Sequence, residues 1–381
     1  MVRPALKALV LAAPPLASLL LFAAVEVSLR GRARLIEPLE FLVRDPHQSH
    51  NFSDDRDVGI FEGDPLLFWR LRPNLEDTIW DFTLVSTNPR GLRHPRPVAS
   101  RPRPDKRIIC LGDSVTFGYR VPVVWAEQPG TYDREARPYP ELLERRLSEA
   151  NPGLNIEVLP LAVPGYSSHQ GRLWLEREIA ALEPDLVTAC FGWNDVSLRG
   201  ASDREAMAAG WPRPMLRALA IRSQTVMRLS LWSHSRLSVE APPGRATERV
   251  SAGEFVGNHM VMARLARGAG ASFLAIGTVY RDAVTFPEEA RRIAGHRREL
   301  REALSEAQIP YLEVEGLTED AYPATNPLFG ETIHPNAAGH AVLSDALLAS
   351  LAKRPKLLPG VAIPESDWLS ALLPEPPSRG R

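Results

Sequence analysis

The chain has 381 residues, and its 45 Lys and Arg residues nearly balance its 46 Asp and Glu residues, for a formal net charge of -1. This balance gives no electrostatic argument for nucleic-acid binding, and a hydrophobic fraction of 44% excludes a disordered chain. The two cysteines, Cys110 and Cys190, lie in predicted core strands, and no Cys/His cluster has metal spacing, so we expect neither a metal nor a cofactor.

The first segment with a clear pattern is an apolar stretch over residues 8–25, preceded by basic residues. Its length suits a membrane-spanning helix or a long signal-peptide hydrophobic region. At the candidate cleavage sites Leu21 or Phe22 stands where a small residue is needed, which favours an uncleaved anchor. Arginines follow the segment as well, so the positive-inside rule does not fix its orientation. We therefore predict an N-terminal signal anchor, a transmembrane helix, over residues 1–30.

Residues 31–104 are rich in turn-forming residues and hold short aromatic runs at 67–72 and 78–85. Such runs are typical of β-strands. Prolines interspersed with arginines close the segment between residues 95 and 104 and indicate a linker or an extended crossing. The sequence thus predicts a small β-rich lead-in ahead of the main domain.

From residue 105 to residue 354, apolar runs alternate with amphipathic segments, and no hairpin turn signals lie between the runs. Strands separated by helices form a parallel sheet covered on both faces. We therefore predict an α/β domain of three layers, an α/β/α sandwich. The predicted strands are residues 107–111, 155–161, 185–191, 271–277 and 309–314, and the predicted helices are residues 140–150, 168–182, 254–267, 287–307 and 335–352.

Two segments do not follow this alternation. Residues 197–252 carry apolar residues at mostly helical spacing right after the loop of the third strand. They fit either a cap over the site or a helical elaboration packed on the sheet edge. Residues 355–381 are rich in proline and predict a loosely attached C-terminal tail.

Four short blocks fall at the carboxyl ends of predicted strands or just before the last helix, at the sheet edge where α/β proteins bind ligands. A Gly-Asp-Ser turn ending at Ser114 follows the first strand, and a turn with Gly165 follows the second. Asn194 follows the third strand, and His334 precedes the last helix. Each block alone also fits an ordinary structural role, as a helix cap, a turn glycine or an exposed histidine.

Together these residue types suit nucleophilic attack on a carbonyl group. A neutral serine is a poor nucleophile, so a histidine must accept its proton, and a carboxylate or carbonyl must hold the resulting imidazolium. A glycine N–H can approach the substrate closely, and an asparagine amide is an uncharged donor for the developing oxyanion. We therefore expect Ser114, His334, Gly165 and Asn194 to converge on one point.

The order and spacing of the blocks resemble those of the SGNH hydrolases, also called the GDSL esterase and lipase family, over about residues 106–353. The resemblance implies an SGNH/flavodoxin-like fold in which Ser114 is the nucleophile and His334 the general base. It also implies an oxyanion hole formed by the backbone N–H groups of Ser114 and Gly165 and the side-chain amide of Asn194. In the family, the residue three positions before the histidine orients the imidazole, and here that residue is Glu331.

Two positions depart from the family pattern. Glu331 stands where the family usually has aspartate, so the loop has to absorb an extra methylene, and Asp320 is a reserve candidate for the triad acid. Leu161 stands where the family often has asparagine. That change removes a supporting hydrogen bond but leaves the oxyanion donors in place.

The resemblance implies a serine esterase that hydrolyses carboxylic esters through an acyl-enzyme, with O-acyl groups on glycans or lipid-derived esters as substrates. Bacterial proteins of this kind lie outside the cytoplasmic membrane, so we expect a membrane-anchored chain with a periplasmic or extracellular catalytic domain and no nucleic-acid partner. Two other functions stay open. One is an O-acyltransferase that passes the acyl group to a sugar hydroxyl, and the other is a catalytically inactive binding or assembly module on the same fold.

Overall fold

The computed structural model describes residues 4–32, 57–98, 103–209, 222–229, 246–279, 286–314, 328–330 and 333–365. The chain divides into two compact units, one of residues 1–69 and 206–245 and the other of residues 70–205 and 246–381. The second unit holds the main sheet and every described residue of the predicted site.

The first unit begins with one long helix, α1 (Pro4–Arg32). The Glu26 carboxylate of this helix accepts hydrogen bonds from the backbone N–H groups of Gln224 and Thr225, both at 2.9 Å. No helix in the described part of the chain is both long enough and apolar enough to cross a membrane. The helix expected within residues 1–30 is therefore present, but its predicted role as a transmembrane anchor is not supported.

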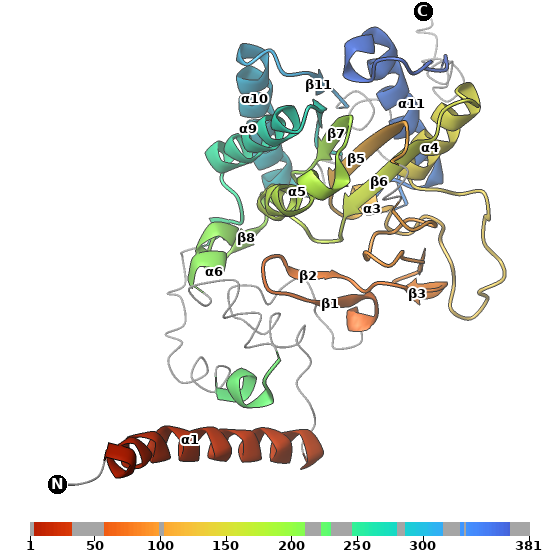
Figure 1. Cartoon of the computed structure of the whole chain (residues 1–381). Coiled ribbons are helices and arrows are strands. Elements are labelled where there is room, and N and C mark those ends of the chain that lie inside the picture. The colour runs from red at the N-terminus through yellow and green to blue at the C-terminus, as the bar shows by residue number, and fades with distance from the viewer. Residues whose placement is uncertain are drawn as a thin grey trace, which may run out of the picture. The chain divides into compact units, whose positions relative to one another are not determined.

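The second unit is built on a five-stranded parallel sheet (Figure 1). The strand order β11-β10-β7-β5-β6 places β5, the strand before Ser114, inside the sheet. Residues 108–111 of β5 are fully buried, in agreement with their continuous apolar character. The strands are β5 (Lys106–Gly112), β6 (Ile156–Ala162), β7 (Leu186–Cys190), β10 (Ser272–Ile276) and β11 (Tyr311–Leu312).

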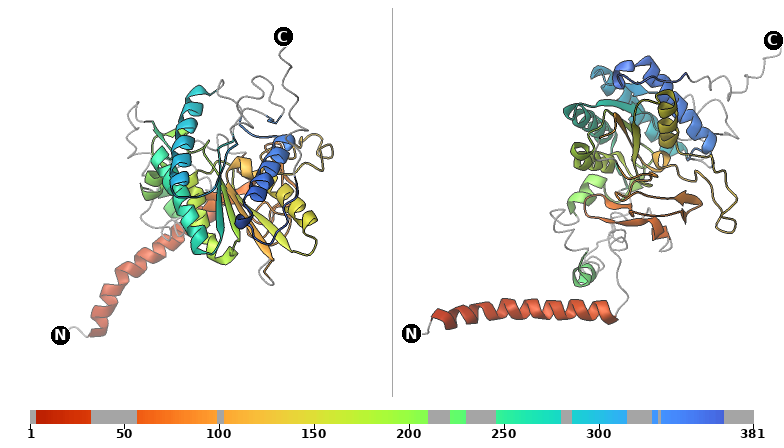
Figure 2. Two further views of the ribbon diagram at one scale, coloured as in Figure 1. Left: turned by 90° about the horizontal axis from the view of Figure 1, so that it is seen from above. Right: turned by 45° about the vertical axis from the view of Figure 1, so that its right-hand side comes forward.

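Helices cover both faces of the sheet (Figure 2). Two helices pack against each other on one face, and three pack together on the other. This arrangement confirms the predicted three-layer α/β/α sandwich. The helices of the first face are α4 (Tyr139–Ala150) and α11 (Ala337–Lys353), and those of the second are α5 (Ser168–Leu182), α9 (Ala252–Gly268) and α10 (Pro287–Glu306).

The pairing register of the sheet sets where three of the site loops begin. Gly112, the last residue of β5, pairs with Ala162 of β6 and with Cys190 of β7. The three strands therefore end together at one edge of the sheet. The loops that carry the predicted nucleophile and the predicted oxyanion donors leave the sheet next to one another.

The two cysteines behave as buried apolar residues, as predicted. Cys110 and Cys190 lie on the neighbouring strands β5 and β7, and neither forms a disulfide. Burial raises the pKa of the Cys110 thiol to about 12, so the reactive thiolate is not populated near neutral pH.

The lead-in differs from its prediction in one respect. Residues 78–85, expected as one strand, form the hairpin β3 (Thr78–Trp80) and β4 (Thr83–Val85). The chain turns at Asp81 and Phe82, which both take positive φ angles, 42° and 58°. This is the conformation of a tight two-residue hairpin turn, usually marked in a sequence by glycine or asparagine, and Phe82 gives no such signal. A second small sheet pairs β1 (Phe61–Asp64) with β2 (Phe68–Leu71).

The insertion over residues 197–252 is described at its two ends. There β8 (Leu198–Arg199) pairs antiparallel with β9 (Thr247–Glu248), and α6 (Asp203–Ala209) follows β8. Residues 210–221 and 230–245 lie outside the described residues, so the predicted cap stays a prediction. The predicted tail from residue 355 starts with a short 3-10 helix (Pro355–Leu357), and residues 366–381 also lie outside the described part.

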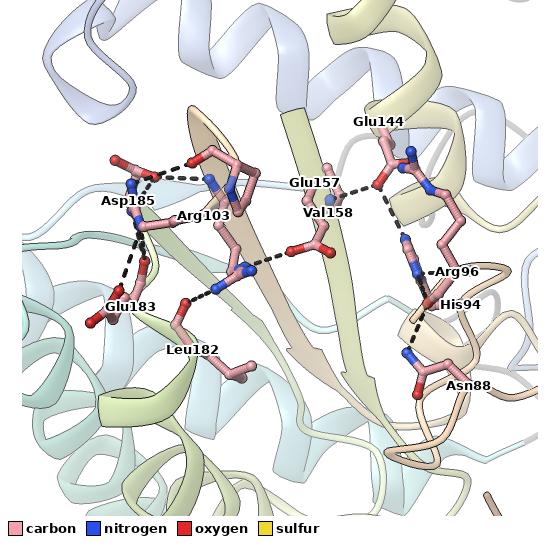
Figure 3. Close-up of polar contacts among 12 residues, drawn as sticks. Asn88, His94, Arg96, Arg103, Glu144, Glu157, Val158, Leu182, Glu183 and Asp185 are labelled. Atoms are coloured by element: carbon pink, nitrogen blue, oxygen red, sulfur yellow. Dashed lines mark hydrogen bonds and ion pairs between the residues drawn. The ribbon is translucent and has the colours of Figure 1, made fainter. Parts of the chain in front are cut away.

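A buried ion pair links β5 and β6 near their amino ends, within a network of polar contacts (Figure 3). Arg107 Nε lies 2.6 Å from Glu157 Oε2, and the two side chains are only 3% and 6% exposed. A looser pair lies nearby, where Arg103 Nε is 3.9 Å from Glu183 Oε2 and the side chains are 37% and 68% exposed. The two pairs differ in both burial and distance.

We expect Glu157→Gln to lower the free energy of unfolding by about 3 kcal/mol, because the buried Arg107 guanidinium loses its carboxylate partner. Denaturant unfolding measures this change. Glu183→Gln is the matched control in the exposed pair, and its expected loss is below about 1 kcal/mol. Equal losses in the two variants would contradict the prediction.

Candidate active site

Ser114 lies in the turn after β5, where the chain enters the short helix α3 (Ser114–Phe117). The Asp113 side chain caps this helix by accepting a hydrogen bond of 2.9 Å from a backbone N–H. Gly112 has to be glycine, because a Cβ atom there would lie 1.9 Å from Thr116 Oγ1. The turn thus holds a partly exposed serine at the carboxyl end of an interior strand.

His334 meets Ser114 from a distant part of the chain. His334 Nε2 lies 2.8 Å from Ser114 Oγ, although the two residues are 220 positions apart. Backbone hydrogen bonds fix the loop that carries the histidine, from the Gly330 N–H to the His334 carbonyl (3.1 Å) and from the Asn336 N–H to the Leu328 carbonyl (2.9 Å). Asn336 then caps α11 with its side chain. The structure therefore brings together the predicted nucleophile and the predicted base.

The ring of Tyr119 packs against the ring of His334. The ring centroids are 4.2 Å apart, and the planes are inclined by 40°. The Tyr119 hydroxyl donates a hydrogen bond to the Asp81 carboxylate in the β3–β4 turn. The sequence gives no signal for Tyr119, because nothing in its spacing from Ser114 indicates that the histidine loop folds back over it.

Two of the predicted oxyanion donors are the backbone N–H groups of Ser114 and Gly165. The Ser114 N–H is at the N-terminus of α3, and Gly165 takes a φ of 84°, which favours glycine. Among the described residues, neither N–H has a hydrogen-bond acceptor. Both are therefore available to a ligand oxygen.

The third predicted donor, Asn194, is engaged by the protein. Its Nδ2 donates to the Tyr166 carbonyl at 3.0 Å and to Asp113 Oδ2 at 3.2 Å. These bonds join the loop after β7 to the loops after β6 and β5. The amide is thus held beside the serine turn, and a substrate oxygen would replace one of its two acceptors.

Two buried carboxyl groups flank these loops. Burial raises the pKa of Asp113 to about 6, although hydrogen bonds and the nearby His334 act to lower it. Burial likewise raises the pKa of Asp195 to about 7. Asp195 Oδ1 accepts from the N–H and the hydroxyl of Ser168, at 2.9 and 2.5 Å, whereas Oδ2 has no hydrogen-bond partner in the described part of the chain. Asp195 therefore ties the loop after β7 to the start of α5.

The predicted triad acid cannot be placed. Glu331 and the reserve candidate Asp320 both lie outside the described residues. Leu161, where a supporting hydrogen bond was in doubt, is a fully buried residue of β6.

Residues 110–342 match the sequence model of the GDSL-like lipase/acylhydrolase family. No curated protein matches the chain.

Similar solved structures include LAE5, an α/β hydrolase from the metagenome of Lake Arreo, Spain (17% identity, 65% of this chain and 95% of that chain covered, TM-score 0.43). The lipase/acylhydrolase of Enterococcus faecalis is 16% identical over 68% of this chain and 100% of its own, with a TM-score of 0.42. The acetylxylan esterase Axe2 of Geobacillus stearothermophilus is 16% identical over 65% of this chain and 94% of its own, with a TM-score of 0.43. These similarities are too distant to indicate a substrate.

The buried carboxyl of Asp195 predicts a pH-dependent stability. Because folding raises its pKa from 3.8 to about 7, the folded chain holds a proton that the unfolded chain has already lost, and stability falls as pH rises through that window. Asp195→Asn cannot ionise, so its free energy of unfolding should improve relative to the wild type between about pH 4 and pH 7. Denaturant unfolding across this range measures the difference.

Asp133→Asn, at an exposed position, is the control. Its free energy of unfolding should stay within about 0.5 kcal/mol of the wild type, because exposed substitutions change stability little. A difference between Asp195→Asn and the wild type that stays constant with pH would refute the assignment.

Proposed function

Because the chain belongs to the GDSL-like lipase/acylhydrolase family and is an ester-hydrolysing enzyme, we propose that it is a serine esterase working through an acyl-enzyme at Ser114. The observation that carries this proposal is the 2.8 Å contact between Ser114 Oγ and His334 Nε2. A histidine at that distance can accept the hydroxyl proton as the oxygen attacks. This contact supports an active hydrolase over an inactive binding module.

The proposed reaction has two halves. Ser114 Oγ attacks the ester carbonyl carbon while its proton passes to His334 Nε2, and the carbonyl oxygen becomes an oxyanion. The tetrahedral intermediate expels the alcohol, which takes the proton from His334, and leaves the acyl group on the serine. Water then repeats the attack, its proton passing to His334, and the acid leaves as Ser114 regains its proton.

The oxyanion is proposed to bind the N–H groups of Ser114 and Gly165 and the amide of Asn194. Support comes from the two N–H groups without acceptors among the described residues and from the position of Asn194 against Asp113 and Tyr166. Its bond to Asp113, at 3.2 Å, is the longer of the two and is the one that we propose the oxyanion replaces. Glu331 remains the proposed acid that orients the imidazole.

The surface beside His334 favours an ester whose alcohol part contains a ring that can stack on aromatic side chains. We define the aromatic ledge as Trp80, Phe82, Tyr119 and Trp125. Tyr119 touches the histidine ring, Trp80 packs edge-on to Tyr119 at 5.9 Å, and Phe82 packs on Trp125 at 4.8 Å, leaving Trp125 52% exposed. Because His334 protonates the departing alcohol, the alcohol part of the ester lies on this side.

We therefore propose O-acylated glycans as the substrates, with lipid-derived esters as the alternative. The apolar face of a sugar ring stacks on aromatic side chains, whereas the acyl group lies on the far side of the serine. We further propose that the domain works outside the cytoplasm. The basis is the resemblance to bacterial SGNH proteins that lie outside the cytoplasmic membrane, and a periplasmic reporter fused after Arg34 tests it.

Ser114→Ala and His334→Ala should each lower kcat for p-nitrophenyl acetate by about 10⁴-fold or more, because either change removes the nucleophile–base unit. The double variant should lose no more than either single variant, since the two residues act together. Ser305→Ala, an exposed serine on α10, should keep wild-type activity. Substantial turnover by Ser114→Ala would rule out the acyl-enzyme.

Trp125→Ala should lower kcat/KM for an acetylated oligosaccharide by about fivefold, the effect of losing about 1 kcal/mol of aromatic contact. It should leave ethyl acetate hydrolysis unchanged, because that alcohol is too small to reach Trp125. Leu198→Ala removes an exposed apolar side chain outside the ledge and is the control. A loss on both substrates, or on neither, would contradict the glycan assignment.

A further inference from the structure

We propose that Arg249 is a positioning residue for the oxyanion hole, a role that rests on the proposed function. Arg249 lies at the end of the insertion and is only 2% exposed. Its Nη1 donates to the Gly165 carbonyl at 2.8 Å. The guanidinium therefore holds the turn whose N–H is a proposed oxyanion donor.

The other two guanidinium nitrogens of Arg249 bind the same region. Nε and Nη2 form a fork on the Asp203 carboxylate at 3.0 and 2.9 Å, and Nη2 also donates to Gln170 Oε1 at 2.9 Å. The Ser167 hydroxyl donates to the same Asp203 carboxylate at 2.5 Å. Ser167 and Gln170 form the capping box of α5, so Arg249 and Asp203 fix both the Gly165 turn and the helix start that follows it.

The backbone around Arg249 also holds the loop of Asn194. The Arg249 N–H donates to the Ser197 carbonyl at 2.9 Å, and the Val250 N–H donates to the Asp195 carbonyl at 3.0 Å. One short segment thus reaches the loops of two of the three proposed oxyanion donors. The Arg249 side chain binds the Gly165 loop, and the backbone of Arg249 and Val250 binds the Asn194 loop.

Rigid placement explains these contacts better than stability does. A buried ion pair adds little to the free energy of unfolding, because the cost of desolvating both charges offsets their attraction. Gly165 has wide conformational freedom and sits at a positive φ, so its turn needs an external contact to stay in one conformation. A fixed donor pays no reorganisation cost when the oxyanion forms.

The chain offers a matched control. Arg107 is equally buried, at 2% exposure, and pairs with a buried carboxylate, Glu157, near the amino ends of β5 and β6 (Figure 3). The site loops leave the carboxyl ends of the same strands. Arg107→Met should therefore cost stability as Arg249→Met does, while sparing the chemistry.

The experiment measures kcat, KM and unfolding for both methionine variants and for Arg249→Lys, with p-nitrophenyl acetate as the substrate. It also measures inhibition by a boronic acid, which adds to the serine and mimics the tetrahedral intermediate. We expect Arg249→Met to lower kcat by about 10- to 100-fold with KM within about threefold, and to weaken boronic acid binding by a similar factor. Arg107→Met should change kcat by less than about threefold.

Arg249→Lys covers the case in which the methionine variant does not fold. The lysine keeps a positive charge beside Asp203, but a single ammonium group cannot reproduce the fork and the contact to Gly165 together. It should fold and still lose about tenfold in kcat. A folded Arg249→Lys with wild-type kcat and boronic acid affinity would overturn the proposal, as would an equal kcat loss in Arg107→Met.

Failure of the proposed function has a separate signature. If Ser114→Ala retains the turnover of the wild type, the acyl-enzyme is wrong whatever Arg249 does. If Ser114→Ala is inactive and the Arg249 variants keep wild-type kcat and boronic acid affinity, only the positioning role of Arg249 is wrong.

Discussion

The hydrogen bond between Ser114 and His334 is the contact on which the rest of the site depends. It joins residues 220 positions apart, so it forms only when β5 and the loop before α11 are both in place. The serine is held by a turn at the end of an interior strand, where Gly112 leaves no room for a side chain. The histidine is held by backbone bonds on both sides and by the ring of Tyr119. Neither residue reaches the other through local structure alone.

The proposed oxyanion donors depend on a different constraint, the register of the sheet. Because Gly112 is level with Ala162 and Cys190, the loops after β5, β6 and β7 start at the same height. Side-chain hydrogen bonds then join these loops. Asn194 reaches the loops of the other two strands, and Asp195 binds the start of α5. The catalytic geometry is thus a consequence of parallel strands that end together.

The sequence pattern predicted the sheet and its helices well, because long apolar runs and helical periodicity are determined locally. The helix predicted over residues 168–182 has those bounds in α5. The pattern failed where a non-glycine turn at Asp81 and Phe82 splits an expected strand. The contact between Arg249 and Asp203 could not be predicted from the sequence. The two residues are 46 positions apart, at the two ends of an insertion, and no periodic pattern relates them.

The short pairing of β8 with β9 joins the two ends of the insertion at its root. Once the root is closed, the entropic cost of the segment between residues 199 and 247 grows only slowly with its length. The length of that segment beyond Asp203 can therefore change at little cost while the pairing of β8 with β9 is kept. Length changes in this one region would leave the Ser114–His334 contact, and with it the reaction, intact.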